Sequence, residues 1–286
     1  MERTRIRLTV PTGRLQSAVL ELLAQAGVVI TATEKNYRPP VGDDRFQVKL
    51  MKAANIATLV ELGKHDLGFT GLDWVRESGA AVETLFDTGL DPVRLVAAAP
   101  PGRDPFAVVG RPVVVASEYE RLASGYVAER ARDYRCVRTA GATEVFPPED
   151  ADLIVDNTAT GAALRQNGLC EIDELLRSTT LLVGNRVALA DAGLRGEIED
   201  LVLLMQGALA ARERVLLEMN VVRERLDAVV AMLPAMKAPT VQPLFGTSGF
   251  AVKAAVERRR VAQLIPALRR AGATDILESS LRRVVP

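Results

Sequence analysis

The chain has 286 residues, and its 36 Lys and Arg residues balance its 36 Asp and Glu residues, so the formal net charge is zero. This balance excludes a nucleic-acid-binding protein that depends on bulk positive charge, and any phosphate binding must be local. The length and a hydrophobic content of 48% suit two or three compact domains.

The cysteines, the single histidine and the N-terminus exclude further classes. Cys136 and Cys170 lack the spacing of a zinc site and indicate a reducing compartment. His65 is the only histidine and lies in a polar loop, so we expect chemistry without a histidine base. The sequence opens on a charged strand and carries neither a signal peptide nor an apolar span, so we expect a cytoplasmic protein with no membrane contact.

The first hundred residues alternate between strand and helix patterns. Apolar or alternating runs predict strands at residues 3–10, 28–32, 46–51, 66–70 and 92–99. Helical periodicity predicts a helix at residues 14–26 and a second helix that follows residues 52–55 and runs to about residue 62. The turn at residues 71–73 leads into a third helix, which carries Trp74. This βαβ alternation predicts an α/β fold with a mainly parallel sheet.

Two strand-to-helix turns in this region are candidate ligand sites. Arg14 begins a helix just beyond the carboxyl end of a strand, where open α/β sheets bind ligands. Thr70 and Gly71 place a hydroxyl and a glycine at a similar turn, which makes a second candidate anion cradle. Taken alone, Arg14 is better explained as a solvated surface arginine.

The alternation restarts after a Pro-rich linker at residues 100–105. Ser117 and Glu120 have the spacing of a capping box and predict a helix start. Further strands are expected at residues 112–116, 134–137, 152–155 and 178–183, and a long helix at 188–212. A second α/β unit inserted in the first predicts two lobes, joined by two crossovers, that hold a ligand between them.

Residues 151–169 carry the strongest chemical signal. A short apolar strand leads through a hydroxyl-rich turn into a helix that starts at Ala162, and the free N–H groups of a helix start attract anions. Thr158 and Thr160 add hydroxyl donors, and Gly161 allows close approach of a phosphate. Asp156 would repel a phosphate, so it is suited to sugar hydroxyls or a developing positive charge. Phosphate, ribose and carboxylate together suggest a phosphoribosyl site, although this stretch taken alone is better explained as an ordinary capped helix after a strand.

The last 75 or so residues follow another pattern. Strands are expected at residues 214–221, 240–244, 249–256 and 275–285, with helices at 223–233 and 259–271. This βαββαβ order predicts a ferredoxin-like unit. Such a unit, appended to an enzyme, senses a ligand or holds subunits together.

Several segments, in the correct order over nearly the whole chain, resemble the long form of ATP phosphoribosyltransferase. In the catalytic part they are residues 11–15 (PTGRL), 66–73 (DLGFTGLD), 143–145 (TEV) and 156–167 (DNTATGAALRQN). In the tail they are residues 217–220 (LEMN), 239–241 (PTV) and 271–277 (AGATDIL). Each motif alone is weak, but the set is fairly specific.

The resemblance implies a two-lobed, periplasmic-binding-protein-like α/β core with a C-terminal ferredoxin-like (ACT-like) domain. Lobe I would comprise residues 1–99 and 182–208, lobe II residues 100–181, and the regulatory domain residues 209–286. The implied reaction is attack of ATP N1 on C1′ of phosphoribosyl pyrophosphate, with release of pyrophosphate, as the first step of histidine biosynthesis. Mg²⁺ would enter with the phosphates, and no protein metal site is expected. Histidine would inhibit a homo-oligomer, a dimer or a hexamer.

The resemblance also implies roles for individual residues. Asp156, Arg14 and Lys52 would be catalytic. The phosphoribosyl group would lie against Asp156, Asn157, Thr158, Ala159, Thr160, Gly161, Ala162, Ala163 and Leu164. The nucleotide and pyrophosphate would lie against Gly13, Arg14, Lys49, Lys52, Gly71, Asp73 and Glu144. Regulatory histidine would lie against Asn220, Thr240 and Ala273.

Three departures from the family pattern keep other functions open. Thr12 stands where the family often has lysine, residues 52–55 (KAAN) replace R-P-R-D, and Ala162–Ala163 replaces a pair that usually includes threonine. They favour, as alternatives, a weakened or inactive paralogue that binds a nucleotide or metabolite, or a non-catalytic subunit of an active partner. A periplasmic receptor fits poorly, because no signal peptide is visible.

Overall fold

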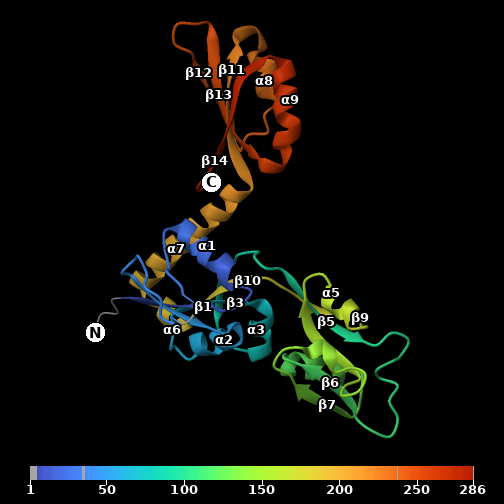
Figure 1. The fold of residues 1–286 in the computed structure, drawn as a ribbon. Coiled ribbons are helices and arrows are strands. Elements are labelled where there is room, and N and C mark those ends of the chain that lie inside the picture. The colour runs from blue at the N-terminus through green and yellow to red at the C-terminus, as the bar shows by residue number, and fades with distance from the viewer. Residues whose placement is uncertain (1–4, 34–35, 237, 286) are drawn as a thin grey trace. The chain divides into compact units, whose positions relative to one another are not determined.

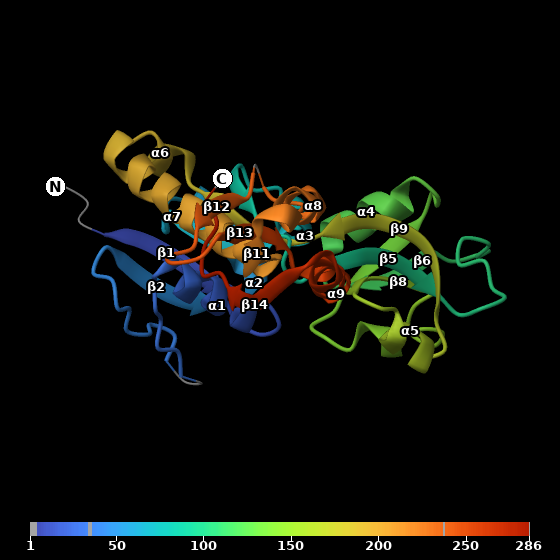
Figure 2. The ribbon, with the colours of Figure 1, turned by 90° about the horizontal axis from the view of Figure 1, so that it is seen from above.

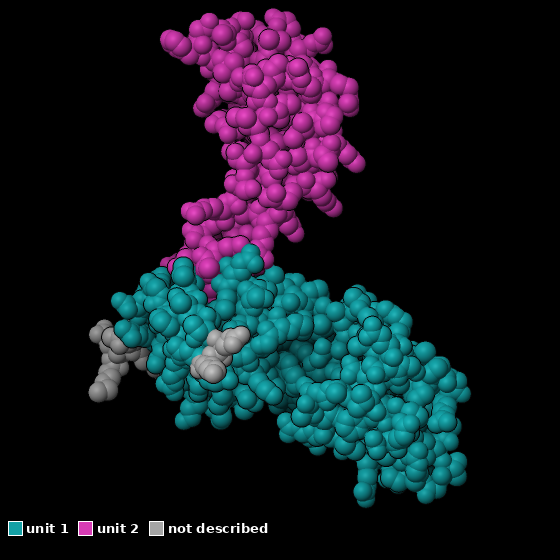
Figure 3. Space-filling model, viewed as in Figure 1, with its two compact units in different colours: residues 1–21, 28–198 teal, residues 22–27, 199–286 magenta. Residues whose placement is uncertain are grey.

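The structure is a computed structural model that describes residues 5–33, 36–236 and 238–285. It divides into two compact units, Met1–Glu21 with Val28–Ile198 and Leu22–Gly27 with Glu199–Pro286 (Figure 3). The chain passes from one unit to the other within helices α1 and α7 (Figure 1). None of the helices in the described part of the chain is long and apolar enough to span a membrane.

The first lobe of unit 1 is built on a five-stranded sheet of order β2-β1-β3-β10-β4. Strand β1 pairs in parallel with β2 and β3, whereas β10 runs antiparallel to β3 and β4. Its strands are β1 (Ile6–Pro11), β2 (Phe46–Met51), β3 (Leu67–Gly71), β4 (Glu83–Asp87) and β10 (Thr180–Gly184). The helices of this part are α1 (Gln16–Ala26), α2 (Ala53–Glu61), α3 (Leu72–Ser78), α6 (Arg186–Leu189) and α7 (Ala192–Arg212).

The second lobe has its own five-stranded sheet, of order β7-β6-β8-β5-β9. Helices α4 and α5 cover its two opposite faces (Figure 2), because alternate residues of β5 and β8 are apolar on both sides. Leu95 and Leu153 pack on the α4 side, and Val96 and Ile154 pack on the α5 side. The elements are β5 (Val93–Ala99), β6 (Val113–Ser117), α4 (Glu120–Ala128), β7 (Tyr134–Arg138), β8 (Leu153–Thr158), α5 (Ala162–Gln166) and β9 (Cys170–Ser178).

The two-lobed α/β core is confirmed, but the mainly parallel sheet is wrong. Each lobe combines two parallel and two antiparallel strand pairs, since β10 and β5 both run against their neighbours. The boundary between lobes I and II, expected at residue 99, lies earlier in the chain. Strand β5 pairs with β8 and β9 in the second sheet, so the chain crosses before Val93 and returns near residue 179. An apolar run predicts a buried strand but not its direction or its sheet.

Four local expectations differ from the structure. Residues 28–32 form only one isolated bridge, Ile30 with Val41, instead of a strand. Strands β4 and β9 were not anticipated. Ser117 ends β6 and does not cap the next helix, because its hydroxyl donates to the Val155 carbonyl and accepts from the Tyr119 N–H. The helix begins only at Glu120.

The C-terminal part of unit 2 confirms the expected ferredoxin-like βαββαβ order. Its antiparallel sheet has the order β12-β13-β11-β14. Alternate residues of β11, such as Leu217 and Met219, are buried against Val229 of α8 and Leu268 of α9. The elements are β11 (Arg214–Val222), α8 (Leu226–Met232), β12 (Thr240–Pro243), β13 (Gly249–Glu257), α9 (Val261–Ala271) and β14 (Ala273–Ser280).

Candidate active site

A cavity of about 160 Å³ in unit 1 is lined by residues of both sheets. Four of the predicted site residues line it, namely Arg14, Gly71, Asp73 and Asn157. Arg14 and Gly71 follow or end β1 and β3, and Asn157 lies near the end of β8. The cavity therefore opens at the carboxyl ends of strands, where open α/β sheets place ligands.

Arg14 is a cation at the mouth of this cavity. Its side chain is 50% exposed, and Nη1 lies 3.8 Å from Asp91 Oδ1 and 3.4 Å from the Asp91 carbonyl oxygen, to which it donates. Asp91 lies in the segment that crosses from β4 to β5 and has a positive φ of 49°. Sequence reasoning missed Asp91, because an Asp before Pro92 reads as an ordinary turn.

Asp73 is a buried carboxylate that connects α3 to the second sheet. Its Oδ1 accepts from Ser178 Oγ at 2.8 Å, and its Oδ2 accepts from Tyr119 Oη at 2.6 Å. The same Tyr119 oxygen accepts from Asn157 Nδ2 at 2.9 Å, and its ring stacks on Trp74 at 4.4 Å. Burial, together with the negative charge of Asp73, raises the pKa of Tyr119, so the phenol stays a neutral donor.

Tyr119 and Ser178 were not found from the sequence. Tyr119 stands between two glutamates, which is typical of a surface position, yet it is fully buried. Its partner Asp73 lies 46 residues away, and Ser178 is 105 residues from Asp73. A search for buried polar groups that need partners applies only once the fold is known.

We predict that Tyr119→Phe lowers the free energy of unfolding by about 1–3 kcal/mol, because Asp73 then keeps a buried oxygen without its donor. Asp73→Asn in the Tyr119→Phe background should cost much less than it does alone, since the pair is coupled. Denaturant unfolding of the two single variants and the double variant measures the coupling free energy between Tyr119 and Asp73. Tyr37→Phe is the control, as Tyr37 is 60% exposed. Strictly additive effects would contradict the coupling.

Asp156 lies in β8 just before the predicted phosphate-binding turn. Neighbouring strand residues point to opposite faces, so Asp156 and Thr158 share one face and Asn157 points to the other, toward Tyr119. Desolvation raises the pKa of Asp156 to about 6, and the charges of Glu144 and Glu118 add to this. Hydrogen bonds from the Asn157 N–H, at 2.7 Å, and from Thr143 act in the opposite direction.

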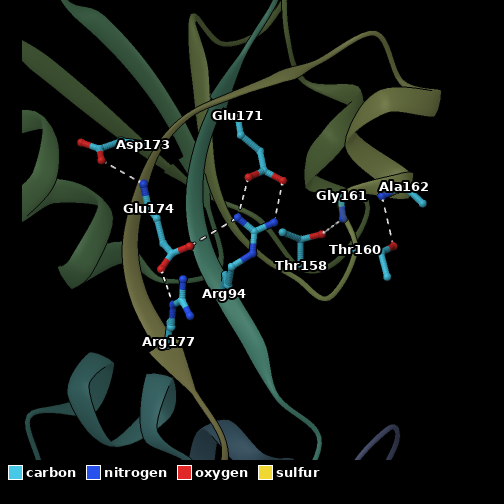
Figure 4. Close-up of polar contacts among 9 residues, drawn as sticks. All are labelled: Arg94, Thr158, Thr160, Gly161, Ala162, Glu171, Asp173, Glu174 and Arg177. Carbon is cyan, nitrogen blue, oxygen red and sulfur yellow. Dashed lines mark hydrogen bonds and ion pairs between the residues drawn. The ribbon is translucent and has the colours of Figure 1, made fainter.

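The turn after β8 is held by its own threonines. The Gly161 N–H donates to Thr158 Oγ1 at 2.9 Å, and the Ala162 N–H donates to Thr160 Oγ1 at 3.4 Å (Figure 4). Gly161 has a φ of 71°, which suits glycine. Ala159 and Ala163 are exposed, whereas Leu164 is buried under the sheet and anchors the short helix. The hydroxyls keep their own protons, so they remain able to donate to an anion.

Asp156, Glu144 and the turn residues 158–164 do not line the cavity, and neither do Lys52, Lys49 and Gly13. Lys52 is exposed just before α2, although the next residue, Ala53, lines the cavity. Lys49 lies in the middle of β2, and its charge helps to lower the pKa of His65, which precedes β3, whereas the cavity is at the other end of that strand. Gly13 has a φ of 81° and stands between the lining residues Thr12 and Arg14.

The predicted regulatory residues are only partly together. Asn220 of β11 donates from Nδ2 to Asp275 Oδ2 at 2.9 Å, and Ala273 is fully buried on the adjacent strand β14. Thr240 lies on β12, which is separated from β11 by β13, and it is exposed. Asp275, which was not predicted as a site residue, places a carboxylate beside Asn220.

The fold defines a two-lobed α/β class with a cavity between the two sheets, lined by Arg14 and Asp73 among others, and with a ferredoxin-like domain appended. Residues 52–207 match the family model described as ATP phosphoribosyltransferase, and residues 211–283 match the HisG C-terminal domain. Among curated relatives, the ATP phosphoribosyltransferase of Pelotomaculum thermopropionicum is 39% identical over 99% of this chain and 100% of its own length. That of Prosthecochloris aestuarii is 36% identical, over 98% and 97%.

A solved structure of an ATP phosphoribosyl transferase is also similar to this chain. It is the ATP phosphoribosyl transferase (HisG:HisZ) complex from Thermotoga maritima, with a TM-score of 0.62 and 25% identity over 70% of this chain and 98% of that chain. The chain belongs to the ATP phosphoribosyltransferase family, and its C-terminal domain is that of the long form. It is a transferase that catalyses the first step of histidine biosynthesis, which favours the active enzyme over the inactive paralogue considered above.

Proposed function

We propose that ATP and the pyrophosphate of phosphoribosyl pyrophosphate bind in the cavity between the two sheets. The sugar would extend past the carboxyl end of β8 and place its 5-phosphate on the turn at residues 158–164, which lies outside the cavity lining. The observation that carries this proposal is the partly buried Asp156, which stands at the start of that turn with a raised pKa. Adenine N1 attacks C1′, the bond from C1′ to the pyrophosphate oxygen breaks, and the pyrophosphate takes both bonding electrons.

The catalytic demand is electrostatic. The sugar becomes positively charged near C1′ as the leaving group departs, and a carboxylate in a low-dielectric site stabilises such a charge more than it does in water. With a pKa of about 6, Asp156 is mostly ionised at neutral pH. The cost of keeping it ionised in a desolvated site is offset when the positive charge develops.

The first lobe supplies the positive end of the site. Arg14 faces the cavity beside Gly71 and would hold pyrophosphate or the triphosphate, with Lys52 at its edge. Within residues 5–33, 36–236 and 238–285, no cluster of three or more His, Cys, Asp or Glu side chains is arranged to hold a metal ion. Mg²⁺ would arrive on the substrate phosphates and neutralise the leaving group, and Glu144 would contact its bound water.

The function is tested by mixing the purified protein with ATP, phosphoribosyl pyrophosphate and Mg²⁺, with pyrophosphatase added, and following product formation by absorbance. We expect turnover that requires both substrates. Stoichiometric release of pyrophosphate without a phosphoribosylated nucleotide would contradict the transfer, and binding of both substrates without any product would restore the inactive alternative.

We further propose that histidine inhibits through the ferredoxin-like domain, in a homo-oligomer that works in the cytoplasm. Asp275, held by Asn220, offers a carboxylate to the ammonium group of the amino acid.

We therefore predict that Asp275→Asn raises the histidine concentration for half inhibition by about tenfold or more, since charge-assisted bonds are worth about 1.5–3 kcal/mol. Inhibition curves, each relative to its own uninhibited rate, measure this. Asp227→Asn on α8 is the control, and equal shifts in both variants would refute the assignment.

A further inference from the structure

Arg94, near the start of β5, is a cation beside the phosphate-binding turn. Strands β5 and β8 pair antiparallel with Arg94 directly opposite Thr158. Side chains that are directly opposite in such a pair lie on the same face of the sheet, and Asp156, two residues before Thr158, shares that face. Arg94 therefore lies on the same side of the sheet as Thr158, to which the proposed function gives the sugar phosphate, and Asp156, to which it gives the charge near C1′.

Arg94 is neutralised by carboxylates from the neighbouring strand β9. Its Nη1 lies 2.6 Å from Glu171 Oε2 and its Nη2 lies 2.8 Å from Glu171 Oε1, which is a bidentate pair (Figure 4). Glu174 Oε2 lies 3.4 Å from the same Nη1. The Arg94 side chain is 30% exposed and that of Glu171 is 32% exposed, so solvent reaches both.

Glu171 also lies against the turn itself. A Cβ added to Gly161 would meet Glu171 Oε1 at 2.7 Å and Arg165 Nη1 at 2.9 Å. The carboxylate is thus placed between the backbone of the turn glycine and two guanidinium groups. The Glu171 carboxylate therefore occupies the space beside the turn, next to the guanidinium groups of Arg94 and Arg165.

We infer that Arg94 binds the 5-phosphate of the sugar substrate and that Glu171 is a placeholder carboxylate, which this phosphate displaces. The inference rests on the proposed function. A phosphate presents the same pair of oxygen acceptors to a guanidinium as a carboxylate does, with more charge, so Arg94 exchanges one bidentate partner for a stronger one. Glu171 then turns to Arg165 or to solvent. The exchange replaces hydrogen bonds and ion pairs only, and no covalent bond is made or broken.

A placeholder carboxylate and a merely structural ion pair predict opposite signs for the effect of removing Glu171 on ligand binding. If the pair only holds β5 against β9, removing either partner loosens the same contact, and both changes weaken ligand binding. If Glu171 competes with the phosphate, removing Arg94 weakens binding, whereas removing Glu171 strengthens it.

The test is calorimetric titration of the full-length protein with ribose 5-phosphate, together with the KM for phosphoribosyl pyrophosphate. Arg94→Gln should raise the ribose 5-phosphate Kd about ten- to hundredfold, the usual loss for a charge-assisted bond, and Arg94→Lys should recover part of it. Glu171→Gln should lower the Kd about two- to tenfold. Arg111→Gln is the matched control, because Arg111 makes a bidentate pair with Asp152, at 2.7 and 2.6 Å, at the other end of β8. The ribose 5-phosphate Kd of Arg111→Gln should stay within about twofold of the wild-type value.

Equal weakening by Arg94→Gln and Glu171→Gln, or an unchanged Kd in Arg94→Gln, would overturn the inference while turnover of the wild-type enzyme leaves the proposed function intact. A wild-type protein that neither binds ribose 5-phosphate nor turns over would overturn both. Thermal unfolding of each variant separates a change in binding from loss of the fold.

Discussion

Asp156→Asn should lower turnover by about a hundredfold or more and, at the same time, stabilise the folded protein. The loss of turnover follows because the amide cannot offset the positive charge that develops at C1′. The gain in stability follows because Asp156 is kept ionised in a desolvated position, where the negative charges of Glu144 and Glu118 also disfavour its ionisation. Replacing it with a neutral group of the same shape removes this cost.

The direction of the pH dependence follows from the raised pKa of Asp156. The folded state holds this proton more tightly than the unfolded chain, because its pKa is about 6 rather than the ordinary value near 4. The stabilisation from the bound proton is therefore full below pH about 4 and is lost as the pH rises through about 6. A shift of about two units corresponds to about 3 kcal/mol, which is an upper bound for the gain in Asp156→Asn at neutral pH.

Denaturant unfolding at pH 5 and pH 8 measures this gain, which should be larger at pH 8. Asp152→Asn is the control with the opposite sign, since the hydrogen bond from Arg111 lowers the pKa of Asp152. That variant should lose stability at neutral pH. An Asp156→Asn protein that is no more stable than the wild type would show that the carboxylate is not strained by its surroundings.

Gly71→Ala should disrupt the site from the first lobe, with a loss of about 3 kcal/mol in stability and a fall in turnover of about tenfold or more. The backbone of Gly71 has an ordinary φ of −74°, so strain at that residue is not the cause. A Cβ there would overlap Asp73 Oδ1 and lie 3.3 Å from Ser178 Oγ. The buried carboxylate would have to leave its donors, which is costly inside a protein.

Gly125→Ala is the matched control for this change. Gly125 lies within helix α4, and nothing is within 4 Å of the position that its Cβ would occupy. Alanine is the better helix former, so this variant should be unchanged or more stable by up to about 1 kcal/mol. Thermal unfolding and steady-state turnover of both variants measure the contrast. A Gly71→Ala enzyme with normal turnover would mean that the position of Asp73 does not matter.

The sequence predicted the local structure around the site well, because that structure is encoded locally. The strand, turn and helix at residues 151–169 lie within about three residues of the expected positions, with the helix starting at Ala162 as expected. Apolar residues and the glycine of the turn specify them without distant partners. The ferredoxin-like order was predictable for the same reason, since its strands alternate clearly.

The contacts between the sheets were not predictable, because they join residues far apart in the chain. No feature of the sequence near Tyr119 predicts that its hydroxyl donates a hydrogen bond to Asp73. Strand β9 (CEIDELLRS) was missed because its side chains are mostly exposed and include three carboxylates, so it lacks an apolar face. The hydrogen bonds that Thr158 and Thr160 accept from the turn N–H groups were not predicted from the sequence either.

The pH dependence of kcat/KM, measured side by side for the wild type and Asp156→Asn, tests most directly whether an ionised Asp156 drives the transfer. The profile reports groups of the free enzyme and free substrates, so the variant identifies which part belongs to Asp156. We predict that the wild-type rate falls as the pH drops below about 6 and that this dependence is reduced in the variant, at a much lower rate. Equal rates and identical profiles for the two proteins would contradict the account.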